Sequence, residues 1–189
     1  MDIDEIKNLL SEKRPSFYRY PEPVIVYLHW TAGHYGQDYP EYHFCIDEDG
    51  TITNTRDLDE IPAATYGRNE GSIAIALDAG YKAAAYKGDP YKVDLGKEAP
   101  TDDQIEAMAI LMAAISETFN IPIDIQHFMT HAEAADNMDG RNMTEPYGPA
   151  TTCERWDLAV LKNDDEWGSG GDTLRGKAIF YQQMEANNE

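Results

Sequence analysis

Two histidines and a cysteine are the residues of this 189-residue chain whose types and surroundings could bind a metal. His29 follows the apolar run Val24–Leu28, His131 follows a second apolar stretch that ends at Thr130, and Cys153 follows a loop rich in glycine and proline. Imidazole and thiolate are ligands that zinc prefers, and three protein ligands leave a fourth position for water. Zinc lowers the pKa of that water to about 7 and polarises a carbonyl beside it. The residue types therefore indicate an open, hydrolytic zinc site, with satisfied core histidines and an unrelated thiol as the alternative.

The elements that position these residues form an alternating pattern of strands and helices. Histidines at the carboxyl ends of strands lie where open α/β sheets bind their ligands. Runs of β-branched and aromatic residues predict strands at 24–28, 42–47, 51–57, 72–77 and 121–130. Apolar residues at helical spacing predict helices at 2–13, 101–119, 154–162 and 172–186. We expect an α/β fold: a single domain with a central mixed β-sheet flanked by helices.

The boundaries of the domain follow from composition. We expect residues 1–21 to form an N-terminal helical extension in which Pro15 ends the helix, and residues 22–163 to form the catalytic domain. We expect residues 164–189 to form an acidic, glycine-containing linker followed by a C-terminal helix. Residues 168–171 are predicted to be the flexible part of that linker. Residues 78–100 read as a long surface excursion.

Charge and hydropathy exclude several functions. The formal net charge of −20 disfavours binding to nucleic acid, whose phosphates need clustered Lys and Arg. No apolar run approaches the roughly 20 residues that span a bilayer, so we expect no membrane insertion. The acidic N-terminus does not resemble a signal peptide, which predicts synthesis in the cytoplasm. Cys45 and Cys153 are therefore expected to be separate thiols.

Four short motifs occur in a familiar order. They are His29-Trp-Thr-Ala, Tyr42-His-Phe with the later Asp49-Gly50, Ser72-Ile-Ala-Ile, and His131 followed by Cys153. This order resembles the zinc-dependent N-acetylmuramoyl-L-alanine amidases of the family that includes phage amidase-type lysozymes and peptidoglycan recognition proteins. The resemblance covers residues 22–162 and implies a peptidoglycan-recognition-protein-like fold. It implies one Zn²⁺ ion held by His29, His131 and Cys153, a catalytic Tyr42, and a helper at Thr151.

The chain departs from the family pattern in ways that affect the site. Thr151 stands where phage members often have lysine, so oxyanion stabilisation must depend more on zinc and Tyr42. Ala76 stands where another branch has a glutamate base. Some relatives use aspartate as the third ligand, which makes Asp157 the alternative to Cys153. Relatives commonly carry a groove-lining histidine near residues 63–67, where this chain has Thr65 and Tyr66; with Trp30 and His34 these are our candidate substrate contacts.

The neighbours of Tyr42 are expected to play other roles. If residues 42–47 form a regular strand, His43 and Cys45 point to the face opposite Tyr42. We therefore expect His43 to have a packing or hydrogen-bonding role and Cys45 to be a small buried hydrophobe.

The resemblance implies hydrolysis of the amide between N-acetylmuramic acid and L-alanine in peptidoglycan. The lack of a signal peptide suggests a phage or prophage endolysin, made in the cytoplasm and released to act on the cell wall at host lysis. The alternatives are a non-catalytic peptidoglycan-binding protein, a wall-recycling amidase that acts on soluble muropeptides, and a toxin delivered to competitors. We expect a monomer whose partner is peptidoglycan.

Overall fold

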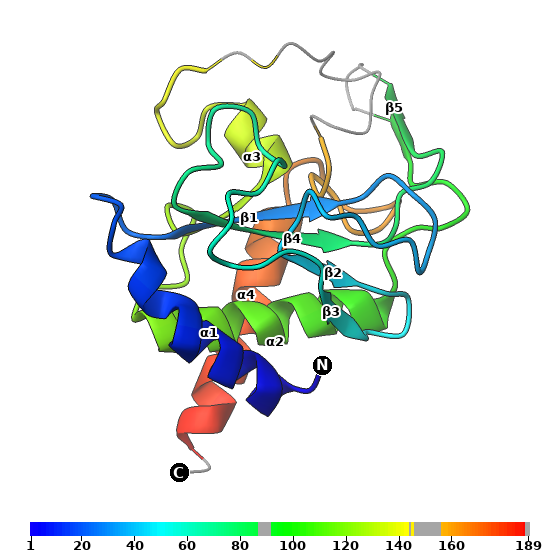
Figure 1. The fold of residues 1–189 in the computed structure, drawn as a ribbon. Coiled ribbons are helices and arrows are strands. Elements are labelled where there is room, and N and C mark those ends of the chain that lie inside the picture. Colours follow the sequence, from blue (N-terminus) through cyan, green and yellow to red (C-terminus); the bar gives the residue numbers. More distant parts are fainter. Residues whose placement is uncertain (87–91, 144, 146–155, 188–189) are drawn as a thin grey trace.

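A mixed five-stranded sheet forms the centre of the protein (Figure 1). The computed structural model describes residues 1–86, 92–143, 145 and 156–187. The strand order is β3-β2-β4-β1-β7, with β1 Ile25–Trp30, β2 Phe44–Ile46, β3 Ile52–Asn54, β4 Ser72–Leu77 and β7 Phe128–Thr130. β1 pairs in parallel with β4 and β7, β2 pairs in parallel with β4, and β3 runs antiparallel to β2. The predicted fold class is confirmed.

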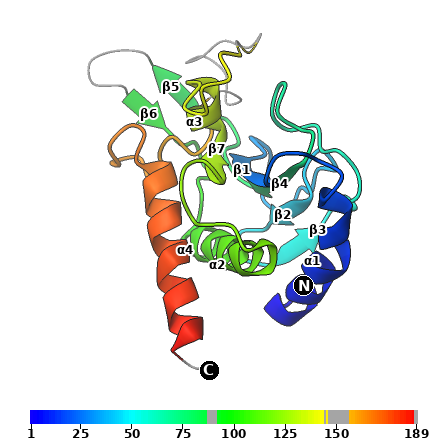
Figure 2. The same cartoon turned by 90° about the vertical axis from the view of Figure 1, so that its left-hand side faces the viewer.

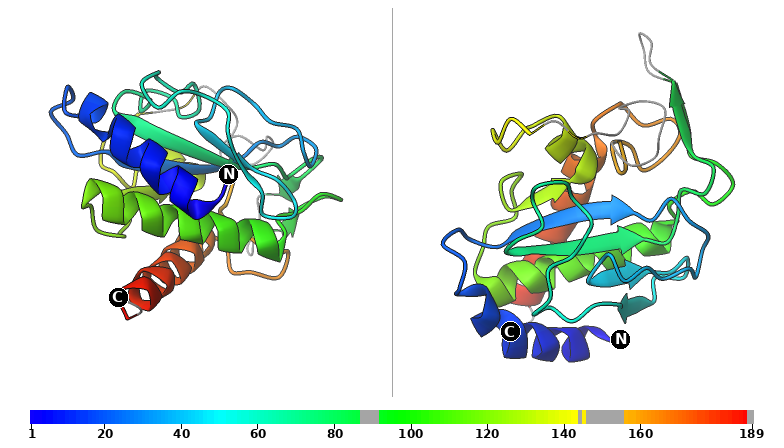
Figure 3. Two further views of the ribbon diagram at one scale, coloured as in Figure 1. Left: turned by 60° about the horizontal axis from the view of Figure 1, so that its bottom comes forward. Right: turned by 45° about the horizontal axis from the view of Figure 1, so that its top comes forward.

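Three helices cover one side of this sheet, and a short helix lies on the other side (Figure 3). The three are α1 Ile3–Phe17, α2 Asp102–Phe119 and α4 Gly170–Ala186. Helix α2 lies between α1 and α4 and contacts both (Figure 2). The short helix is α3, His131–Ala135. No helix in the described ranges is both long and apolar enough to cross a lipid bilayer.

The apolar core lies between the sheet and the three helices. Leu28 and Ile75 from the central strands belong to it, and so do Ile6 of α1 and Leu174 of α4. Each of these four side chains is 0% exposed. The two terminal helices are thus built into the same core as the sheet. The region expected to be a surface excursion contains a hairpin of β5, Ala84–Tyr86, and β6, Lys92–Asp94.

The face of the sheet that points away from these helices carries the polar residues. The register places His29 of β1 beside Ala76 of β4, and Ala76 beside Cys45 of β2. Residues matched in register point to the same face, so Cys45 shares the face of His29. Its predicted orientation away from the site was wrong, because Tyr42 and His43 form a bend rather than a strand. The alternation that we assumed therefore does not apply between Tyr42 and Cys45.

Two helix ends differ from the sequence-based expectation. Helix α1 continues through Pro15 to Phe17. Pro15 lies near the end of the helix, where its carbonyl still accepts a hydrogen bond from the Tyr18 N–H, and proline φ is compatible with a helix. At the other end of the chain, Gly170 and Gly171 are buried in the first turn of α4 instead of forming a flexible linker.

Gly170 and Gly171 allow the start of α4 to lie close to α3 and to the segment around Leu158. A Cβ at Gly171 would collide with the Glu133 carboxylate of α3, and a Cβ at Gly170 would collide with the Leu158 carbonyl oxygen. Residues 156–162 form irregular turns rather than the predicted helix. The start of α4 therefore packs directly against the segment that carries Asp157.

Candidate metal centre

His29 is delivered by β1, one residue before that strand ends. The imidazole is 1% exposed, because the strands on either side and the segment around Asp157 enclose it. Nδ1 lies 3.1 Å from Asp157 Oδ2, and Nε2 lies 3.2 Å from the Thr65 hydroxyl oxygen. Both ring nitrogens thus have a polar neighbour.

His131 is the first residue of α3, and a capping box fixes its position. The Thr130 hydroxyl accepts a hydrogen bond from the Glu133 N–H at 3.2 Å, and the Glu133 carboxylate accepts one from the Thr130 N–H at 2.9 Å. Arg175 of α4 in turn donates to both oxygens of Glu133, at 2.9 and 2.7 Å. The backbone from which His131 projects is therefore held by a buried ion pair.

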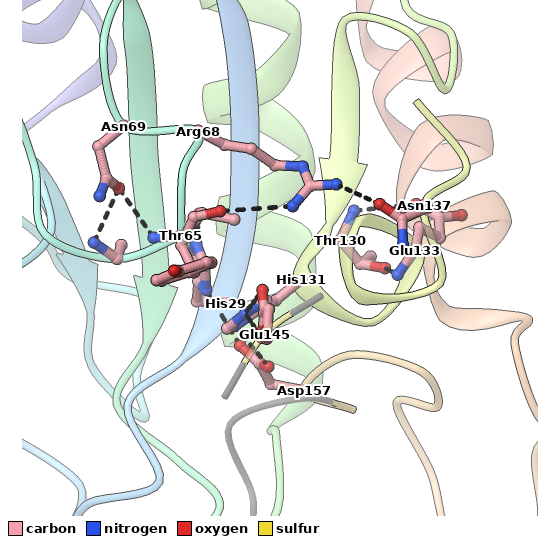
Figure 4. Close-up of polar contacts among 12 residues, drawn as sticks. His29, Thr65, Arg68, Asn69, Thr130, His131, Glu133, Asn137, Glu145 and Asp157 are labelled. Carbon is pink, nitrogen blue, oxygen red and sulfur yellow. Dashed lines mark hydrogen bonds and ion pairs between the residues drawn. The ribbon is translucent and has the colours of Figure 1, made fainter. Parts of the chain in front are cut away.

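The two imidazoles meet at Asp157 (Figure 4). His131 Nδ1 lies 3.0 Å from Asp157 Oδ1, while His131 Nε2 lies 2.9 and 3.1 Å from the two carboxylate oxygens of Glu145. Asp157 is 1% exposed and Glu145 is 2% exposed. One ligand atom from each of His29, His131 and Asp157 lies within 4.8 Å of the others. Two imidazoles and one carboxylate form a suitable donor set for a catalytic zinc with an open fourth position.

Two details support the fit of this donor set to a metal. Asp157 Oδ1 is buried and makes no hydrogen bond of acceptable geometry, although it lies close to His131. The ring nitrogens that point away from Asp157 are held by Thr65 and Glu145. Metal-binding histidines usually have such a partner on the other ring nitrogen, since it fixes the tautomer and the ring orientation.

The electrostatics of the cluster favour a cation at its centre. Burial opposes protonation of His131, but Asp157 and Glu145 more than offset it and raise the pKa of His131 to about 10. Burial lowers the pKa of His29, against the opposing effect of Asp157. Burial alone would raise the pKa of Asp157, but His131 and His29 hold it below its ordinary value. The buried carboxylates thus require positive charge beside them, which a divalent metal would also provide.

Tyr42, the residue predicted to be catalytic, lies against His29. Their ring centroids are 5.3 Å apart, with the planes inclined by 49°. The bend before β2 turns Tyr42 toward His29 while His43 remains fully buried. Thr151 and Cys153 lie outside the described residues, so their predicted roles stay predictions.

The candidate substrate contacts fall into two groups. Trp30 is 2% exposed and packs edge-on against Trp156, with 4.8 Å between centroids, so its assignment to substrate binding is corrected to core packing. Thr65 is 1% exposed and its hydroxyl faces His29, so it supports a candidate ligand instead of lining a groove. Tyr66 is 49% exposed, and His34 is exposed beside Glu98. These last two remain available to a substrate.

A buried ion pair connects the loops on the two sides of the site. Arg68 donates to the carboxylate of Asp139 at 2.6 and 3.0 Å and to Asn137 Oδ1 at 3.0 Å. Arg68 is 2% exposed. This bridge joins the loop that holds Thr65 to the chain that leads to Glu145 (Figure 4). We did not identify Arg68 or Glu145 from the sequence, because both lie in irregular segments without periodic spacing.

A cavity of about 460 Å³ lies at the start of β1. Tyr27, Arg68 and Arg141 are among the residues that line it. Tyr27 precedes His29 by two positions and therefore points to the same face of the sheet, roughly 7 Å along the strand. Neither His29 nor Asp157 lines this cavity. The Arg68 guanidinium in its wall is already paired with Asp139, so Arg141 is the more accessible of the two cations.

Comparisons with known proteins identify one family. The family model described as N-acetylmuramoyl-L-alanine amidase matches residues 19–148. Among solved structures, the chain is similar to the Ph2119 endolysin from Thermus scotoductus MAT2119 bacteriophage Ph2119, at 18% identity and a TM-score of 0.40, covering 57% of this chain and 77% of that one. It is also similar to the N-acetylmuramoyl-L-alanine amidase LysC from Clostridium intestinale URNW, at 20% identity and a TM-score of 0.42, covering 69% and 80%. No curated protein sequence matches the chain.

Proposed function

The chain belongs to the N-acetylmuramoyl-L-alanine amidase family, and we propose that it hydrolyses the amide between N-acetylmuramic acid and L-alanine in peptidoglycan with the help of one Zn²⁺ ion. The observation that carries this proposal is the buried convergence of His29, His131 and Asp157, whose ligand atoms lie within 4.8 Å of one another. A zinc ion bound there would polarise the amide carbonyl and lower the pKa of a bound water.

We assign Asp157 as the third ligand, in place of the Cys153 that the sequence favoured. The carboxylate lies between both imidazoles and has an oxygen without a hydrogen bond. Cys153 stays a candidate, since it lies outside the described residues. His29, His131 and Asp157 would together hold the ion, and Thr65 and Glu145 would fix the orientation of the two rings.

The protein side chains around the ion would stabilise and orient the reacting groups. Tyr42, whose ring lies against His29, would donate its hydroxyl proton in a hydrogen bond to the developing oxyanion. Hydrogen-bond donors fixed in advance in a water-poor site stabilise such charge strongly. Thr151 would position substrate or water, as the resemblance implies.

Peptidoglycan would lie over the face of the sheet that carries His29. Exposed Tyr66 and His34 would offer contacts to sugar or peptide. Arg141 lines the cavity near Tyr27 and would attract the carboxylates of the stem peptide. We propose that the enzyme acts as an endolysin on intact cell wall; a recycling amidase would prefer soluble muropeptides.

Digestion of purified sacculi tests this function. The protein is incubated with sacculi before and after removal of metal by a chelator, and again after zinc is restored, and the new ends are identified by mass spectrometry. We expect zinc-dependent release of free L-alanine amino termini. New reducing sugar ends, or binding without any cleavage, would contradict the proposal. A parallel digestion of soluble muropeptides separates an endolysin from a recycling enzyme.

A further inference from the structure

Asp78 is a buried acid that is not part of the His29 centre, and Cys45 and Asp38 lie close to its carboxylate. It follows β4, and its backbone N–H donates to the Ile46 carbonyl at 2.9 Å. The residue is 0% exposed, and within the described structure neither carboxylate oxygen has a hydrogen-bond partner. Burying an ionised carboxylate is costly unless it is paired or bound to a metal. An unpaired carboxylate at this place therefore calls for an explanation.

Two potential metal ligands surround this carboxylate. Cys45 of β2 and Asp38 of the loop before Tyr42 each contribute one ligand atom, and these atoms and one oxygen of Asp78 all lie within 4.8 Å of one another. Cys45 is a buried free thiol, whereas Asp38 is exposed. The cluster thus has a closed inner side and an outer side that solvent can reach.

The Cys45 sulfur accepts a hydrogen bond from a neighbouring backbone group. The Tyr39 N–H donates to Cys45 Sγ at 3.5 Å. The Thr55 hydroxyl lies 3.9 Å from the sulfur, but it donates its proton to the Tyr42 carbonyl at 2.8 Å. The Tyr39 N–H favours the thiolate, which is the form that binds metals, but burial outweighs it and raises the pKa of Cys45 to about 12, so the metal-free cluster holds a neutral thiol. The sulfur also lies 3.7 Å from the Tyr39 carbonyl oxygen, to which a neutral thiol would donate. Both protonation states therefore have a partner, and metal binding would select the thiolate.

We propose that Asp38, Cys45 and Asp78 form a second divalent-cation site. One thiolate and two carboxylates suit zinc or a similar borderline metal better than Mg²⁺ or Ca²⁺, which prefer oxygen ligands throughout. The proposal does not depend on the function proposed for the His29 centre, because it uses none of the same ligands. The net charge of −20 favours cation binding at such a site.

A metal at this place would stabilise the region next to the first centre. Cys45 and His29 flank Ala76 on neighbouring strands, so their Cα atoms are roughly 10 Å apart. Asp38 belongs to the loop that leads into Tyr42. The ion would therefore link this loop to the ends of β2 and β4 and hold the chain before Tyr42 against the sheet.

The metal-free alternative is a proton shared within the cluster. Asp38 and Asp78 could share one proton, or the Cys45 thiol could donate toward Asp78, as acids do when they are held close together. In either case the cluster would bind no metal, and replacing Asp78 by asparagine would remove a buried acid without changing metal stoichiometry. This difference allows a direct test.

Titration of the full-length, metal-free protein with Co²⁺ distinguishes a metal site from a cluster that shares a proton. Thiolate-bound Co²⁺ has an intense ligand-to-metal charge-transfer band, which histidine and carboxylate ligands do not produce. We expect binding of a second equivalent, together with this band. Because Cys153 is a candidate ligand of the first centre, the variants are compared in a Cys153→Ser background, in which Cys45 is the sole thiol. There we expect the band to remain, and adding Cys45→Ser or Asp78→Asn should abolish it. In that background, absence of the band, a band that survives Cys45→Ser, or a band unchanged by Asp78→Asn would overturn the proposal.

Protection of the thiol provides a measurement without any variant, in case a substitution prevents folding. The wild-type protein is alkylated with and without Zn²⁺ under mildly denaturing conditions, and modification of Cys45 is measured by peptide mass spectrometry, with urea-unfolded protein as the control for zinc binding to exposed thiols. We expect zinc to slow the alkylation of Cys45 in the partly folded state only. Equal alkylation rates with and without zinc would contradict a metal site at this cluster.

Discussion

Replacing Glu145 by glutamine tests whether the centre is organised around a metal. The carboxylate faces His131 Nε2 at 2.9 and 3.1 Å and is 2% exposed. Glutamine keeps the shape and one acceptor oxygen but removes the charge that raises the basicity of the ring. Loss of such a partner typically weakens metal binding or activity by about 10–100-fold. Because Glu145 is buried and so is poorly screened by salt, we expect an effect near the upper end, equivalent to about 2.7 kcal/mol.

The assay is a competition for zinc between the protein and a chromophoric chelator at fixed pH. Glu98→Gln is the matched control, since Glu98 also pairs with a histidine, His34, at 2.8 Å but lies outside the proposed centre. We expect Glu98→Gln to bind zinc like the wild type. The reasoning is refuted if Glu145→Gln retains the wild-type dissociation constant, or if both variants lose affinity equally.

Three further predictions concern the hydroxyl beside His29, the pH dependence of stability, and the ion pair between Arg175 and Glu133. Thr65→Val removes the hydroxyl beside His29 Nε2, and the same competition assay should show about 10-fold weaker zinc binding. Burial lowers the pKa of His43 from 6.5 to about 4, so the folded state favours the neutral ring. The unfolded chain therefore binds a proton at His43 more readily than the folded protein does. We expect the folded protein to lose roughly 3 kcal/mol of its free energy of unfolding as the pH falls from 6.5 toward 4. Urea unfolding of metal-free wild type should show this loss, and His43→Gln should show a shallower slope. Arg175→Met leaves Glu133 buried without its partner and should lower the free energy of unfolding by about 3–5 kcal/mol.

Each of these predictions has an outcome that contradicts it. Unchanged zinc binding in Thr65→Val would show that its hydroxyl does not orient His29. Parallel pH profiles for the wild type and His43→Gln would show that His43 does not titrate as described. For Arg175, the double variant Arg175→Met with Glu133→Gln should recover much of the lost stability. No recovery would mean that the arginine acts through packing alone.

The sequence predicted the main features of the fold because they depend on local patterns. The apolar run before His29 forms a buried strand, and the Thr101–Gln104 capping box starts α2 as expected. The sequence-based prediction was wrong where tertiary packing, and not flexibility, explains the residue type. Gly170 and Gly171 read as a flexible linker, but they are glycine because the Leu158 carbonyl and the Glu133 carboxylate lie too close for a Cβ.

The candidate site was predictable only in part. His29 lies at the end of one strand and His131 directly follows another, which is a signal that a single sequence contains. Glu145 follows an irregular loop, and the contact between Thr65 and His29 joins residues 36 positions apart. Contacts of this kind depend on the tertiary fold, which propensity and spacing do not encode. The preference for Cys153 over Asp157 rested on the family resemblance, whereas the placement of Asp157 follows from the three-dimensional structure.

The most direct test of the central claim is a crystal structure of the zinc-loaded protein, with anomalous scattering measured at the zinc absorption edge. We predict an anomalous peak bonded to Nδ1 of His29, Nδ1 of His131 and the carboxylate of Asp157, with Glu145 against the far side of His131. A peak bonded to Cys153 with Asp157 turned away would contradict the ligand assignment. A zinc-loaded crystal without a peak between His29 and His131 would contradict the metal centre itself.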